Sequence, residues 1–120
     1  MRIAQCLMAT VLTLVSLCAG AGTLNEVEIK EAFVQKVITD GHHWSALLLL
    51  NGSIKAFQMG RSRKGRWKTQ DGKFCMAIPE GSTFDCWSVV KHGDGYRFLA
   101  FGQVLFEVTA QEPSSKFQLD

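Results

Sequence analysis

The sequence predicts an α+β protein: one N-terminal helix packed on a curved antiparallel β-meander of six or seven strands, with a partly closed barrel as the alternative arrangement. Two observations predict this fold. Between residues 24 and 39, apolar side chains recur every three or four positions, which is the period of a helix. From His42 onward the apolar period changes to two, and turns that contain glycine recur about every ten residues, which is typical of an antiparallel meander.

Residues 1–21 are expected to form a secretory signal peptide. Arg2 precedes an apolar run that ends at Cys18, and small residues suited to cleavage follow. The run is shorter than the roughly 20 apolar residues that span a bilayer, and no later segment is long and apolar enough, so no transmembrane segment is expected. Cleavage after Ala21 is the first choice and cleavage after Ala19 the alternative. We therefore expect a periplasmic or secreted protein.

Cys75 and Cys86 are the two cysteines that remain once the signal peptide is removed. In an oxidising compartment such a pair is expected to form a disulfide, which stabilises a fold with a loop of this size by about 2–3 kcal/mol. No second pair of metal ligands lies beside Cys75-x10-Cys86, so a structural zinc site is not expected. The sequence calls for no metal and no cofactor.

The expected helix covers residues 24–39. Thr23 and Glu26 match a capping box, and Asp40-Gly41 is expected to end the helix because glycine readily adopts the left-handed conformation found there. Its apolar side is formed by Ile29, Phe33, Val34, Val37 and Ile38.

Seven segments follow the period of a strand. Asn51-Gly52 and Asp71-Gly72 are the strongest short hairpin signals, and a longer glycine-containing loop covers 92–95. The expected strands are 44–50, 53–59, 66–70, 73–78, 84–91, 96–101 and 103–110. Residues 22–110 should form a single β-rich domain, and 111–120 a flexible C-terminal tail in which Phe117 and Leu119 are able to dock.

Alternation along two of these strands predicts a shared apolar face. Phe74 and Met76 point away from Cys75, and Trp87 and Val89 point away from Cys86. A bond between the cysteines therefore places these four apolar residues together on the opposite face of the sheet.

Several short motifs resemble a family of small secreted proteins of unknown function from Gram-negative bacteria, particularly proteobacteria. The resemblance implies export, a disulfide and a β-rich fold, and it implies no catalytic residue. The motifs that carry it are Leu24-Asn25-Glu26-Val27-Glu28-Ile29, an Asn-Gly hairpin, Gly65-Arg66-Trp67, Asp71-Gly72-Lys73-Phe74-Cys75, Cys86-Trp87-Ser88-Val89-Val90 and Gly93-Asp94-Gly95-Tyr96.

Asp40, His42 and His43 form the one local cluster with acid–base or metal-binding character. Adjacent histidines on a strand point to opposite faces, so we interpret the cluster as the polar start of a strand. Glu80 and Asp85 lie on either side of the loop within the disulfide, but a glycosidase site also needs a cleft, which a short meander hardly provides. Ser45, Ser82 and Ser88 have no nucleophile-elbow context, so the chain is not expected to be an enzyme.

The densest charge in the sequence is a basic run with Trp67 inside it. One interpretation is a cationic loop that contacts phosphate, lipopolysaccharide, anionic lipid or an acidic protein; the other is a solvated connection between hairpins. We expect Trp67 itself to turn into the core. The run contains Arg61, Arg63, Lys64, Arg66 and Lys68.

These features favour a binding protein over an enzyme. The leading hypothesis is an exported envelope-interaction module whose partner, an envelope protein or an anionic envelope component, contacts the basic run. The alternative is a secreted enzyme inhibitor acting through the loop 79–85, and a small enzyme using His42 or His43 comes third. With 13 basic and 11 acidic residues and a net charge of +2, nothing indicates binding to nucleic acid.

Overall fold

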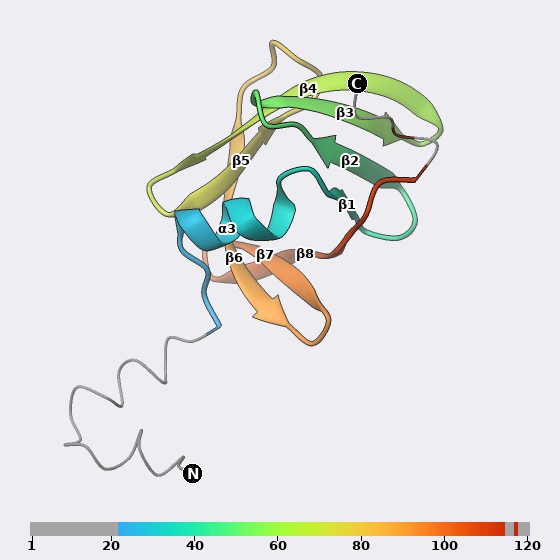
Figure 1. The fold of residues 1–120 in the computed structure, drawn as a ribbon. Coiled ribbons are helices and arrows are strands. Elements are labelled where there is room, and N and C mark those ends of the chain that lie inside the picture. The colour runs from blue at the N-terminus through green and yellow to red at the C-terminus, as the bar shows by residue number, and fades with distance from the viewer. Residues whose placement is uncertain (1–21, 115–116, 118–120) are drawn as a thin grey trace, which may run out of the picture.

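The computed structural model describes residues 22–114 and residue 117. The expected signal peptide and Leu119 lie outside these described residues. The described chain forms a closed antiparallel barrel in which each strand pairs with the next and the last pairs with the first (Figure 1). The strands are β1 (Val37–Thr39), β2 (Trp44–Leu48), β3 (Ser53–Gln58), β4 (Arg61–Gln70), β5 (Lys73–Ala77), β6 (Asp85–His92), β7 (Gly95–Ala100) and β8 (Gln103–Gln111).

Within the described residues, the prediction of a β-rich fold with one helix is confirmed, and the meander closes completely. The helix α3 (Glu26–Phe33) is followed by an eighth strand, β1, where the sequence predicted more helix. Residues 34–39 are mostly β-branched, which lowers helix propensity and favours strands. β1 pairs with β2 on one side and β8 on the other, so the residues lost from the expected helix are those that close the barrel.

Both predicted ends of the helix are wrong. The N-cap is Asn25, whose side chain accepts a hydrogen bond from the N–H of Glu28, and the Glu28 carboxylate in turn accepts from the N–H of Asn25. Asp40-Gly41 forms the turn between β1 and β2 instead of a helix C-terminus.

The predicted apolar face is confirmed and lines the inside of the barrel. Phe74 lies opposite Trp87, and Cys75 lies opposite Cys86 and forms the predicted disulfide with it. Phe33 reaches into the barrel from α3, and its ring contacts Phe74 and Tyr96 edge to face at 5.3 and 5.1 Å between centroids. The remaining fully buried side chains of this core include Ile29, Ile38, Leu48, Ile54, Val89 and Phe98.

The helix covers one end of the barrel, which faces the viewer in Figure 1. The turns β2–β3, β4–β5 and β6–β7 lie at this end, and the Glu26 carboxylate accepts a hydrogen bond of 2.7 Å from the N–H of Gly72 in the β4–β5 turn. The connections β1–β2, β3–β4, β5–β6 and β7–β8 lie at the other end, because successive strands of an antiparallel barrel run in opposite directions. We call this second end the mouth.

A second apolar cluster lies on the outside of the barrel. Phe117 from the expected tail is buried there against Val37 and Leu47, and its ring contacts Phe57 at 5.2 Å. An ion pair of 3.4 Å joins Lys36 to Glu112. Within the part of the chain described, no helix has both the length and the apolar character needed to cross a membrane.

Candidate functional site

The basic run is a strand, not a loop. The sequence placed the start of this strand at Arg66, but β4 begins at Arg61 and pairs with β3 from its first residue. Met59-Gly60 makes the tight turn between them, with φ of 51° and 82°, so no extended connection remains. The sequence signal for this turn is weak because methionine is unusual at a left-handed position, where asparagine or aspartate is common.

Because side chains alternate along a strand, the cations of β4 lie on two opposite faces. Gly65 is buried and pairs with Ile54 of the core, so the odd-numbered residues of β4 share the inner face. Arg61 and Arg63 belong to this inner set but lie at the mouth, beyond the covered part of the barrel, where they are exposed. Lys64, Arg66 and Lys68 point outward.

Two neighbouring residues fix β4 in place. Trp67 turns inward as predicted, and its indole Nε1–H donates a hydrogen bond of 2.8 Å to the Leu49 carbonyl oxygen. Gly65 allows a close approach: a Cβ there would lie 2.7 Å from both the Ala77 carbonyl oxygen and Ile78 Cγ1. The backbone that presents the cations is therefore held from both sides.

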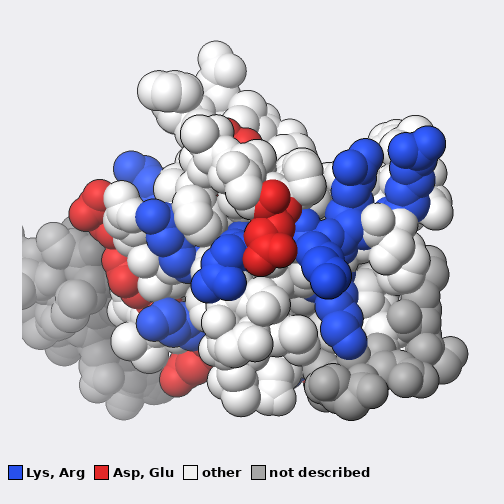
Figure 2. Space-filling view, turned by 90° about the horizontal axis from the view of Figure 1, so that it is seen from above, with Lys and Arg blue, Asp and Glu red and all other residues white. Residues whose placement is uncertain are grey.

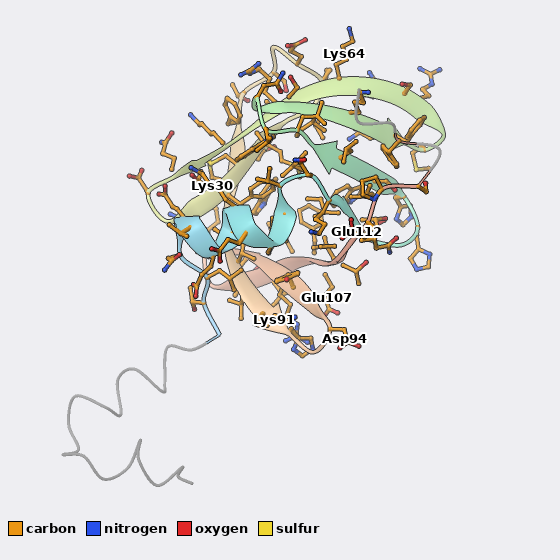
Figure 3. All side chains as sticks on the ribbon, in the orientation of Figure 1. Lys30, Lys64, Lys91, Asp94, Glu107 and Glu112 are labelled. Carbon is orange, nitrogen blue, oxygen red and sulfur yellow. A yellow bond between two sulfur atoms is a disulfide. The ribbon has the colours of Figure 1, made fainter. Side chains whose placement is uncertain are left out.

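The outward cations form a surface that we call the basic wall, defined as Lys64, Arg66 and Lys68. No ion pair among the described residues neutralises them. Lys68 lies over the Phe84 ring with its Nζ 4.4 Å from the centroid, and Lys55 of β3 pairs directly with Lys64. Figure 2 shows Lys and Arg side chains on this side of the molecule with an acidic side chain lying among them, and Lys64 projects from it in Figure 3.

The loop between β5 and β6 lies beside the basic wall. Its base is the disulfide, and the N–H of Glu80 donates a hydrogen bond of 2.7 Å to the Lys64 carbonyl oxygen. Ser82 Oγ and its N–H both donate to the Pro79 carbonyl oxygen, at 2.7 and 3.1 Å. The loop is therefore fixed both internally and to β4.

The Asp40 cluster is a closed turn. Burial acts to raise the pKa of Asp40, but the N–H groups of His42, His43 and Trp44 all donate to its Oδ1 and hold the pKa well below its ordinary value. Its Oδ2 lies 3.1 Å from His43 Nδ1. The Asp40 carboxylate therefore stabilises the β1–β2 turn.

The other candidate residues are not brought together. Glu80 lies on the loop fixed to β4, whereas Asp85 lies on the inner face of β6 at the mouth. His92 ends β6, near the opposite end of the barrel. Within the described residues, no three His, Cys, Asp or Glu side chains converge in a way that could hold a metal ion.

The mouth itself contains a hollow that the sequence did not reveal. Met76 and Trp87 were predicted to share a face, but Trp44 from β2 and Phe106 from β8 join them only because the barrel closes. Alternation within a strand predicts which side chains share a face of that strand. It does not predict which side chains from other strands lie across the barrel from them.

Comparisons with protein-family models, with curated proteins and with solved structures find no match to this chain. The resemblance to small secreted proteobacterial proteins therefore stays a prediction.

Proposed function

We propose that this chain is a non-catalytic binding protein that works outside the cytoplasm and contacts an anionic component of the cell envelope through its basic wall. The observation that carries the proposal is the row of outward cations on one strand, none of which forms an ion pair with another described residue. The disulfide is consistent with an oxidising compartment.

The geometry of the row suits an extended anion. A strand rises about 3.3 Å per residue, so the backbone positions of Lys64 and Lys68 lie about 13 Å apart with Arg66 between them. Three positive charges spaced along one strand match the spaced negative charges of an extended polyanion.

The test compares two variants with the same change in net charge. Lys64→Gln/Arg66→Gln/Lys68→Gln removes the basic wall, and Lys30→Gln/Lys36→Gln/Lys91→Gln removes three cations elsewhere. Binding to lipopolysaccharide, and to heparin as a model polyanion, is measured over a range of salt concentrations, with circular dichroism as the folding control.

The wall variant should bind more weakly, because an exposed charge pair contributes about 0.2–1 kcal/mol and the loss of three predicts about a tenfold lower affinity at low salt. Its affinity should also depend less on salt, since fewer charges are screened. Equal weakening in the control variant would show that net charge alone matters, and would contradict the proposal.

The loop between β5 and β6 supports a second candidate, a secreted enzyme inhibitor. The Glu80 and Ser82 hydrogen bonds and the disulfide hold this loop in one shape, which lowers the entropic cost of inserting it into a cleft. Glu80→Ala/Thr83→Ala and the wall variant are compared in capture of proteins from an envelope extract. A complex with an enzyme that is lost only in the loop variant would favour the inhibitor.

A further inference from the structure

The mouth holds an apolar hollow of about 240 Å³. Two aromatic contacts shape it: the Phe106 ring meets Trp87 at 5.6 Å and Trp44 at 6.2 Å, both edge to face. An apolar cavity of about 150 Å³ accepts a benzene molecule, and drug-sized ligands occupy about 300–1,000 Å³. The hollow therefore has room for one small aromatic body. Its lining is Trp44, Gln58, Met76, Ile78, Asp85, Trp87 and Phe106.

A second, more open hollow of about 490 Å³ adjoins the first, and Trp44 and Gln58 line both. Arg61 and Arg63 line the second hollow, together with His43 and Met59. A mostly apolar hollow therefore lies next to one that two arginines line.

The positive and negative charges at the mouth lie on opposite sides of the two hollows. Arg61 and Arg63 lie on the β3–β4 side, and no ion pair of the described residues involves either of them. Asp85 lines the apolar hollow from β6. An anionic group is therefore attracted to the β3–β4 side and repelled from the β6 side.

We propose that the mouth binds a small aromatic carboxylate or a related aromatic acid. The ring lies in the apolar hollow among Trp44, Trp87 and Phe106, and the acid group lies on Arg61 and Arg63. Guanidinium groups suit this role because they bind carboxylates through paired hydrogen bonds. The site is independent of the basic wall, since it uses the inner residues of β4 and the wall uses the outer ones.

The test uses 1-naphthoate as the probe, its neutral analogue 1-naphthalenemethanol and the acyl anion octanoate, each titrated by calorimetry. The intact protein should bind 1-naphthoate more tightly than either of the other two. Among its three tryptophans, the indole NMR signals of Trp44 and Trp87 should shift, and that of Trp67 should not, because its N–H is held by Leu49 away from the hollow.

Arg61→Gln/Arg63→Gln should weaken 1-naphthoate binding by about tenfold or more and leave the neutral analogue unaffected. Asp85→Asn should strengthen 1-naphthoate binding by about twofold, because it removes a like charge. Lys30→Gln/Lys91→Gln is the matched control, since both residues lie toward the end covered by α3 (Figure 3). All variants are checked by thermal unfolding.

Three results would overturn the proposal. One is unchanged 1-naphthoate affinity in Arg61→Gln/Arg63→Gln with a loss in Lys64→Gln/Arg66→Gln, which would place the anion on the basic wall. The second is tighter binding of octanoate, which would make the ligand an acyl anion. The third is no binding of any probe at millimolar concentration.

Discussion

Removal of the Cys75–Cys86 bond should destabilise the fold by about 3 kcal/mol at 25 °C. The two cysteines are 11 residues apart. In the chain-entropy account, a cross-link over a loop of this size lowers the conformational entropy of the unfolded state by about 9 cal/mol/K. Because each kcal/mol lowers the melting temperature of a domain of this size by about 4–8 °C, a decrease of about 12–24 °C is expected.

The assay is urea unfolding of the oxidised protein, the reduced protein and the Cys75→Ala/Cys86→Ala variant. The reduced protein isolates the cross-link because both sulfur atoms remain, whereas the alanine variant also loses packing at the fully buried Cys75. The alanine variant should therefore be the least stable of the three. A difference below about 1 kcal/mol between oxidised and reduced protein would contradict this account of the cross-link, as would reactive thiols at Cys75 and Cys86 in the unfolded, unreduced protein.

Two further predictions concern the ends of the barrel. Phe33→Ala should lower the free energy of unfolding in urea by about 3–5 kcal/mol, and Phe33→Leu by less, because the fully buried ring fills the core beneath α3. Asp40→Asn should destabilise the fold at pH 7 and differ progressively less from wild type below about pH 4. The folded pKa of Asp40 lies below its unfolded value, so its stabilising contribution is present above the unfolded pKa and is lost as pH falls toward the folded one. A constant difference between pH 7 and pH 2 in unfolding experiments would contradict this.

The seven strands predicted from alternation all exist, and no end shifts by more than five residues. Asp71-Gly72 forms the expected tight turn, with φ of 54° and 78°, and local sequence is enough to specify it. The shared face of Phe74 and Trp87 was predictable because alternation and one cross-link fix it.

The eighth strand was not predictable from local sequence. Val37 and Ile38 fit both the apolar side of a helix and a short strand, and only pairing decides between them. That pairing joins β1 to β8, near the other end of the chain, so the evidence for it is not local. The hollow at the mouth depends on the same closure and was missed for the same reason.

The basic run shows what a high density of basic residues in the sequence can predict about a binding site and what it cannot. Five cations within eight positions predict a charged surface, but the direction of each depends on whether the segment is a loop or a strand. The buried Gly65 and the inward Trp67 settle the direction, since both lie on the odd-numbered face of β4.

This alternation determines which substitutions are informative. A variant that removes Arg61, Arg63 and Lys64 together would disturb the mouth and the basic wall at once, and its phenotype could not be assigned to either surface. Substitutions grouped by face separate them: the odd-numbered arginines report on the mouth, and the even-numbered cations report on the wall. Because Trp67 and the close contact at Gly65 fix the backbone between the two faces, a ligand at one surface does not need to displace a ligand at the other. The two binding proposals are therefore independent, and saturating the mouth with an aromatic acid should leave the affinity of the wall for a polyanion unchanged.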